Sequence, residues 1–445
     1  MDVSNYQLSI NNYQLPEGYK QTEVGVIPDD WEVLELGEIA KLERGKFSAR
    51  PRNDPKFFGG EIPFIQTGDV TQANGKITSY SQTLNEEGLK VSKLFPKNTL
   101  FFTIAANIGD MGFASFATAC PDSLIAILPK AHIEKIWIFH ALRFRKAEFE
   151  DLATQNAQLN INLEKLNPYR VAVPPPLEQR AIAQTLSDVD ALIAALDKLI
   201  AKQRRLKTAT MQQLLTGKKR LPGFGEGKGY KQTEVGVIPE DWEVINLGDN
   251  ADITKLAGFE YTNYFNAYRD AGEIIVVRGI NITHNVLDLT DVKTIPRATS
   301  NKLPRSQLKK GDLVFAYVGT IGPVYLIEES DRYHLGPNTA RITCKDDLIP
   351  EFLLVYFKSE LLRKEIDEKI SVGAQPSLSM TKIRSFKVIH PLIEEQRAIA
   401  TVLSDMDAAI SALETRRAKA QAIKQGMMQQ LLTGKVRLLD EGINN

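Results

Sequence analysis

Two long segments of the chain carry apolar residues at alternating steps of four and three residues, a spacing typical of the heptad seam of a coiled coil. The first segment, residues 177–215, follows three prolines, contains no glycine and ends shortly before Gly217. The second repeats the same register. We predict that these positions form a helix-pair interface: Ile182, Leu186, Val189, Ile193 and Leu196, continued by Ile200, with Ile399, Leu403, Met406, Ile410 and Leu413.

The direction of the predicted helix pair follows from the order of the chain. At about 1.5 Å per residue, a helix of 39 residues spans roughly 58 Å. Each helix comes directly after a module, so an antiparallel pair would place the two modules at opposite ends. Duplicated units commonly assemble with two-fold symmetry, and we therefore expect antiparallel packing. The alternative is that each helix packs on its own module as ordinary core.

The modules show shorter apolar patterns. Residues 61–70, 99–108 and 124–129 alternate or run apolar between Gly, Pro and Asn, which predicts strands. Residues 133–154 and 350–369 predict helices. The expected fold class is α+β, with two globular α/β domains separated by a pair of long antiparallel coiled-coil helices and related by a pseudo-two-fold axis.

An internal repeat sets the organisation of the chain. Residues 18–40 and 229–251 are identical at 18 of 23 positions, EQRAIA recurs at Glu178 and Glu395, and MQQLLTGK recurs at Met211 and Met428. Between these borders the two copies diverge in sequence. The flanking motifs are therefore kept, while the residues between them change. The predicted divisions are a tail (1–17), a module (18–176), a helix (177–217), a linker (218–228), a second module (229–393), a second helix (394–434) and a tail (435–445).

Composition narrows the function. The chain has 445 residues, 43% of them hydrophobic, with two cysteines and no net charge. Neutrality counts against nucleic-acid binding, but residues 41–56 and 198–220 are locally basic. No run of 18 apolar residues and no signal peptide is found, so we expect a cytoplasmic protein without a membrane partner.

Catalytic motifs are not found. The segment Gly223–Gly229 lacks the spacing of a phosphate loop, Asn167-Pro168-Tyr169 is best interpreted as a turn before a strand, and the five histidines lack metal-binding spacing. We therefore predict no catalytic residue, no cofactor and no metal in this chain.

The candidates for DNA contact are polar and basic residues in the module loops, because Arg and Asn can read guanine and adenine edges bidentately, whereas Lys suits phosphate. Weak similarity between the copies aligns Gln66 with Arg278 and Asn107 with Thr320, as two different half-sites would require. The candidates in the first module are Arg44, Lys46, Arg50, Arg52, Asn53, Gln66, Thr67, Asn107, Gln158 and Asn160. Those in the second are Lys255, Tyr261, Tyr264, Arg269, Arg278, Asn281, Thr320, Gln375 and Ser377.

The twin VGVIPxxW boxes at Val24 and Val235, the twin EQRAIA boxes and the twin MQQLLTGK ends together resemble the specificity (S) subunit of type I restriction–modification systems. The resemblance covers residues 18–438. It implies two target-recognition domains that read an asymmetric, bipartite sequence in double-stranded DNA.

The resemblance also implies partners. In this family the S subunit binds two methyltransferase subunits, which use S-adenosylmethionine, and two motor–nuclease subunits, which use ATP and Mg. The paired helices would set the spacing of the half-sites and offer a docking surface. Two alternatives stay open at this point: a coiled-coil adaptor that binds only proteins, and a fragment of a fused restriction–methylation enzyme.

Overall fold

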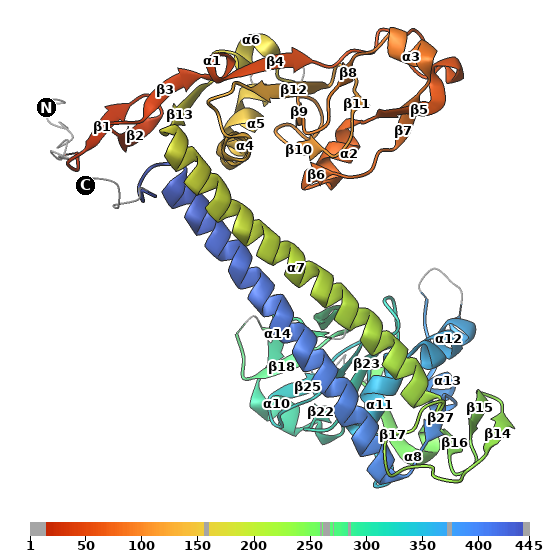
Figure 1. Cartoon of the computed structure of the whole chain (residues 1–445). Helices are drawn as coiled ribbons and strands as arrows, with labels where there is room; N and C mark the ends of the chain where they lie inside the picture. Colours follow the sequence, from red (N-terminus) through yellow and green to blue (C-terminus); the bar gives the residue numbers. More distant parts are fainter. Residues whose placement is uncertain are drawn as a thin grey trace, which may run out of the picture. The chain divides into compact units, whose positions relative to one another are not determined.

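The protein is described from a computed structural model (Figure 1). The description covers residues 15–154, 160–258, 260, 268–269, 271–283, 286–371 and 376–438. The chain divides into two compact units, one made of residues 1–197 and 416–445 and the other of residues 198–415. No helix within the described ranges is long and apolar enough to cross a membrane.

Unit 1 contains a module built on two mixed sheets. The larger sheet has the order β4-β12-β9-β10-β6, in which only the pairing of β10 with β6 is parallel. Its strands are β4 (Ala40–Arg44), β12 (Leu124–Pro129), β9 (Leu100–Thr103), β10 (Met111–Ala114) and β6 (Gly75–Ile77). The smaller sheet has the order β7 (Gln82–Leu84), β5 (Phe58–Phe64), β11 (Thr118–Ala119) and β8 (Leu94–Phe95).

Helices cover these sheets, and a separate hairpin precedes them. The helices are α1 (Leu36–Ile39), η1 (Pro55–Phe57), α2 (Thr67–Gln72), α3 (Glu86–Lys90), α4 (Lys135–Phe144), α5 (Lys146–Thr154) and α6 (Leu163–Leu166). The hairpin consists of β1 (Tyr19–Thr22) and β2 (Gly25–Pro28), and β3 (Glu32–Glu35) pairs with β13 (Arg170–Val173). The last pairing ties the repeated N-terminal box to the strand that leads into the first long helix.

Unit 2 repeats this plan with small changes. Its sheets have the orders β17-β26-β23-β24 and β21-β18-β25-β22. The strands are β14 (Tyr230–Thr233), β15 (Gly236–Pro239), β16 (Glu243–Asn246), β17 (Ala251–Lys255), β18 (Ile274–Val277), β19 (Ile282–Thr283), β20 (Val286–Leu287), β21 (Lys293–Ile295), β22 (Gln307–Leu308), β23 (Leu313–Ala316), β24 (Val324–Leu326), β25 (Tyr333–Leu335), β26 (Thr339–Cys344) and β27 (Lys387–His390). The helices are α8 (Leu247–Asn250), η2 (Gly279–Asn281), α10 (Arg297–Asn301), η3 (Pro304–Ser306), α11 (Pro350–Phe357), α12 (Glu360–Lys369) and α13 (Met380–Arg384).

The predicted α+β class is confirmed, but several assignments were wrong in detail, among them the strand predicted over residues 99–108, since β9 ends at Thr103. Each predicted module helix is broken into two, because the chain leaves helical geometry at Arg145 and at Lys358–Ser359. Residues 67–70, predicted as the end of a strand, begin helix α2. Here the Asp69 carboxylate accepts the Gln66 N–H at 2.7 Å and so caps the helix instead of extending the strand.

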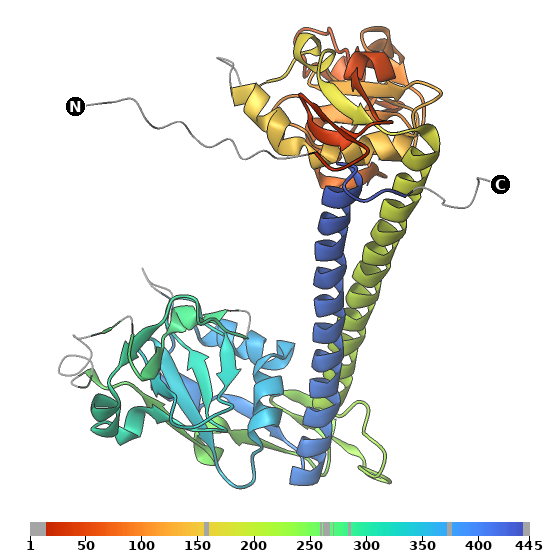
Figure 2. The ribbon, with the colours of Figure 1, turned by 90° about the vertical axis from the view of Figure 1, so that its left-hand side faces the viewer.

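The two long helices are α7 (Pro176–Leu215) and α14 (Ile393–Leu431), and both views show them side by side (Figures 1 and 2). In unit 1, Lys424 donates to Asp190 at 2.6 Å, and in unit 2, Lys207 donates to Asp407 at 2.5 Å. The start of each helix therefore lies against the end of the other. The pairing within each unit is antiparallel, as predicted.

The predicted seam varies in depth along the helices. Ile182, Leu186, Ile399 and Leu403 are fully buried because each lies where the helix also packs on its module. Further along, Leu196, Ile200 and Ile410 are buried, whereas the remaining seam positions, Val189, Ile193, Met406 and Leu413, are half-buried. Two helices alone cannot cover their whole apolar stripe.

A buried carboxylate at the start of α7 joins three distant segments of unit 1. Glu178 is 0% exposed, and it accepts hydrogen bonds from Trp31 Nε1 at 2.9 Å and from Arg437 Nε at 2.8 Å. Arg437 also pairs with Asp30 at 2.7 Å, while Tyr19 donates to the Gly434 carbonyl. The segment after α14 is thus held against the first module, and the predicted tail is anchored up to this point.

The same junction forms in unit 2 from the equivalent residues. Glu395 accepts Trp242 Nε1 at 2.9 Å and the guanidinium of Arg220, which also pairs with Asp241. Burial lowers the pKa of Arg220, but the hydrogen bonds that it donates to the carboxylates of Glu395 and Asp241 outweigh burial and raise the pKa. The predicted linker is therefore fixed at Arg220.

The glutamine of each EQRAIA box completes the repeat. Gln179 accepts the Glu134 N–H just before α4 and donates to the Pro174 carbonyl. Gln396 does the same with the Ile349 N–H and the Pro391 carbonyl. The repeated sequence motifs therefore meet in one contact region, where the module, the start of one long helix and the end of the other are joined.

A histidine is buried beside the paired helices in unit 1. His140 on α4 is 1% exposed, and its Nε2 lies 3.7 Å from Asp190 Oδ2. Burial, then the charge of Lys424, lowers its pKa to about 4, against the opposing effect of Asp190. Helix α11, which follows the equivalent glutamine contact in unit 2, contains no histidine.

Removing the guanidinium of the junction should destabilise one unit at a time. We expect Arg437→Ala to cost unit 1 roughly 3 kcal/mol, because Glu178 would stay buried without its cation. Hydrogen exchange should quicken in residues 19–35 and 176–190. Arg220→Ala should act on the matching segments of unit 2, and Arg205→Ala, which removes an exposed arginine of α7, should change neither. Equal effects on both units would contradict the assignment.

The burial of His140 should make unit 1 sensitive to mild acid. Unfolded histidine takes up a proton near pH 6.5, whereas folded His140 resists protonation down to about pH 4, so stability is lost as the pH falls through this range. We expect His140→Leu, which replaces the imidazole by an apolar side chain, to remove this pH-dependent loss of stability. In urea unfolding at pH 7.5 and pH 5, the variant should gain stability relative to the unmodified protein at the lower pH. If the free energy of unfolding changed equally with pH in the variant and the unmodified protein, this role of His140 would be refuted.

Candidate nucleic-acid interface

The basic loop after β4 is held rigidly and presents its polar side chains outward. Gly45 packs so closely on Cys120 and Pro121 that a Cβ would lie 2.1 Å from the Pro121 carbonyl oxygen. Phe47 is buried in a cluster with three further aromatic rings, those of Phe57, Phe58 and Phe64. The loop therefore has a packed underside, as a precise contact surface requires.

The predicted residues of this loop lie on its exposed side. Arg44 donates to the Asp122 carbonyl at 2.6 Å, and Arg52 pairs with the Asp122 carboxylate at 2.9 Å. Lys46, Arg50 and Asn53 are also exposed. Arg52, Asn53 and Gln66 line one hollow together with the buried rings. Three candidates from two separate sequence segments are thus brought together.

Gln66 and Arg278 occupy equivalent positions in the two modules. Each immediately precedes a helix, α2 or η2, and the N–H of each is accepted by the side chain three residues later, Asp69 or Asn281. Thr67 is the first residue of α2. The predicted pairing of Gln66 with Arg278 therefore corresponds to a shared local geometry with a changed side chain.

Asn281 lies in the interior, contrary to its role as a predicted contact. It is 3% exposed, and its amide donates to the carbonyls of Asp288 and Asp291. Arg278 is half-buried and donates to the same Asp291 carbonyl at 2.7 Å. Asn281 therefore supports the Arg278 loop from within, and this structure does not present it to a ligand.

The remaining described candidates lie on three parts of the modules. Lys255 at the end of β17 and Arg269, which bridges to Thr294, are exposed. Asn107 and Thr320 are exposed in the β9–β10 and β23–β24 hairpin loops, and Asn107 donates to Thr71. Asn160 bridges to Ala105 and Ser377 to Val318, next to those hairpins. Gln158, Tyr261, Tyr264 and Gln375 lie outside the described residues.

Sequence reasoning missed a second group of charged residues near these hairpins. Arg143 donates to Asn74 at 2.6 Å and Lys146 to Asp110 at 2.6 Å, and both line a small polar hollow. Lys358 and Arg363 lie near the hairpin of unit 2. The repeat could have revealed this group, because its residues lie near the helix breaks that occur in both copies.

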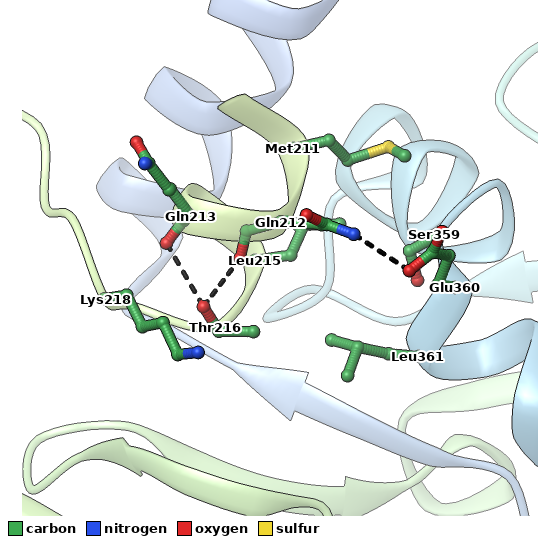
Figure 3. Close-up of a pocket in the computed structure, with 9 residues that line it drawn as sticks. All are labelled: Met211, Gln212, Gln213, Leu215, Thr216, Lys218, Ser359, Glu360 and Leu361. Carbon is green, nitrogen blue, oxygen red and sulfur yellow. Dashed lines mark hydrogen bonds between the residues drawn. The ribbon is translucent and has the colours of Figure 1, made fainter. Parts of the chain in front are cut away.

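A further hollow in unit 2 lies between the end of α7 and the start of α12 (Figure 3). Met211, Leu215 and Leu361 provide its apolar wall, and Gln212 donates to Glu360 at 2.8 Å across it. Its lining contains no histidine, no cysteine and no pair of carboxylates. Among the described residues, no group of three or more His, Cys, Asp or Glu side chains could hold a metal ion.

The geometry defines a class of protein with two binding modules that share one frame but differ in their exposed polar residues. Comparison with known proteins identifies that class. Residues 28–203 and 239–424 match the family model described as the type I restriction modification DNA specificity domain. The protein therefore belongs to the family of type I restriction–modification DNA specificity proteins.

Individual relatives agree over nearly the full length. The chain is 28% identical over 432 residues to a putative type I restriction enzyme MjaX specificity subunit of Methanocaldococcus jannaschii, covering 95% of this chain and 97% of that protein. It is 25% identical to the MjaVIII specificity subunit of the same organism, covering 96% and 98%. A crystal structure of a type I S subunit from M. genitalium shares the fold, with a TM-score of 0.57, 16% identity and coverage of 94% and 97%.

Proposed function

We propose that the protein is the DNA-reading subunit of a type I restriction–modification complex and recognises an asymmetric, bipartite target. Each module would read one half-site, with an unread spacer between them. The observation that carries the proposal is the shared geometry of Gln66 and Arg278, where equivalent backbone positions offer an amide in one module and a guanidinium in the other. Modules that read the same half-site would have no need to differ there.

The chemistry of restriction and methylation would come from partners in the cytoplasm. Two methyltransferase subunits with S-adenosylmethionine, and two motor–nuclease subunits with ATP and Mg, would assemble on this chain. The surface of α7 supports such docking. Leu199 and Leu206 lie seven residues apart in the part of the helix that belongs to unit 2, and they are 39% and 50% exposed. Residues at this spacing share one helix face, and exposed apolar residues on one face favour a protein partner.

Exchange of a module should change half of the target. We expect replacement of residues 41–170 by those of another family member to alter one half-site, because the contacts of unit 2 are untouched. Methylome sequencing of cells that carry the hybrid subunit with its methyltransferase measures both halves at once. A change in both half-sites, or a symmetric target for the unmodified protein, would contradict the modular proposal.

Charging the exposed face of α7 should weaken docking. We expect Leu206→Glu to lower the affinity for the methyltransferase subunits at least tenfold, because a carboxylate would be buried without a partner. Thr208→Glu, which adds the same charge at another exposed position of the helix, is the matched control. Co-purification and analytical ultracentrifugation measure the assembly. Equal behaviour of the two variants would exclude this face.

A further inference from the structure

Each module contains a hollow between a β-hairpin and the helix that follows the helix break. In unit 1 the β9–β10 loop, the end of α2 and helix α5 form it, and its lining includes Thr71, Asn107, Asp110, Lys146 and Glu150. We call it the hairpin hollow of unit 1. It lies entirely within that unit.

Unit 2 contains the equivalent hollow, formed by the β23–β24 loop, β19 and helix α12. Its lining includes Thr283, Thr320, Pro323, Lys358 and Arg363. We call it the hairpin hollow of unit 2. Like its counterpart, it is made only from residues of one unit.

The frames of the two hollows match closely. Gly109 and Gly322 have positive φ angles of 83° and 115°, and their N–H groups donate to Thr103 and Ala316 respectively. The bridges of Ala105 to Asn160 and of Val318 to Ser377 also correspond. The two hairpins are therefore one structure built twice.

The contents of the hollows differ in charge. Asp110 of unit 1 is replaced by Pro323, and Glu150, which is 53% exposed, is replaced by Arg363, which is 77% exposed. Lys146 pairs with Asp110 at 2.6 Å and lies 3.7 Å from Glu150. The hollow of unit 1 thus holds two carboxylates and one cation, whereas that of unit 2 holds two cations, Lys358 and Arg363, and one carboxylate, Asp367, which lies 4.0 Å from Arg363.

We propose that the two hairpin hollows read base edges, with Glu150 and Arg363 as specificity-determining residues of the two half-sites. The inference rests on the proposed function and extends it to a defined site. Arginine binds the O6 and N7 of guanine bidentately, and glutamate accepts from the N4 amino group of cytosine. Arg363 therefore selects guanine, and Glu150 selects cytosine.

Two features favour DNA over a protein partner at this site. Both modules dock the same kinds of partner subunit, so a protein-binding surface should be repeated with its chemistry intact, as the Glu–Arg–Trp junctions are. The two hollows instead share the same hairpin backbone, while the net charge of the side chains that line them changes sign. The two residues also stand on helices, and α12 is capped by Ser359, whose Oγ accepts the Leu362 N–H. Helices position side chains more firmly than loops do.

The test uses the specificity subunit assembled with its methyltransferase subunits and a library of DNA targets randomised over both half-sites. We expect Arg363→Ala to relax the preference at one base pair of one half-site by about ten- to a hundredfold, because one bidentate contact is lost. Glu150→Gln should relax one position of the other half-site. Thermal unfolding should not change, since both side chains are exposed.

Matched controls use exposed residues outside the hollows. Arg332→Ala in unit 2 and Glu87→Gln in unit 1 remove charges that each pair with a near neighbour in sequence, and both should leave the target unchanged.

Three results would overturn the inference. Uniform weakening across all sequences with a reduced salt dependence would make Arg363 a phosphate contact only. Loss of methyltransferase binding would make the hollow a protein interface, and an unchanged target would place it outside the DNA contact. All three presuppose that the unmodified complex reads a bipartite target. If it does not, the proposed function itself fails.

Discussion

A charge removed from water must be paired inside the protein, and this requirement shapes the whole chain. Glu178 and Glu395 are buried at the starts of the long helices, where an unpaired carboxylate would cost several kcal/mol. Each is neutralised by an arginine that follows the end of the opposite helix, Arg437 or Arg220. The antiparallel pairing therefore has a fixed end point at each junction, set by electrostatics as well as by the apolar seam.

The regular elements could be predicted because their signals are local. The heptad spacing of α7 and α14 gave the bounds of both helices within two or three residues, and β12 was predicted at its observed bounds. The junctions could not be predicted in the same way. In sequence, Arg220 and Arg437 resemble solvated charges in a linker and a tail, and only tertiary structure reveals the buried partner. The helical turn at Thr67 was missed because a single cap, Asp69, overrides an apolar run.

The candidate interface shows a similar division. Alignment of the two copies found the positions where the frame is kept and the side chain changes, such as Gln66 with Arg278, because a repeat supplies its own comparison. Alignment could not say which way a side chain points. Asn281 matches Asp69 as a capping residue, yet burial beneath the Arg278 loop gives it internal partners. Exposure depends on what packs above a residue, and no local pattern encodes that.

The division of the chain into one continuous unit and one split unit has a consequence for biosynthesis. Residues 198–415 are contiguous, so unit 2 can assemble as soon as they have left the ribosome. Unit 1 needs residues 416–438, including Arg437, which leave the ribosome only after the whole of unit 2. Its module must therefore wait, with Glu178 unpaired, until the whole of unit 2 has been made. Unit 1, whose synthesis starts before that of unit 2, is therefore completed after it.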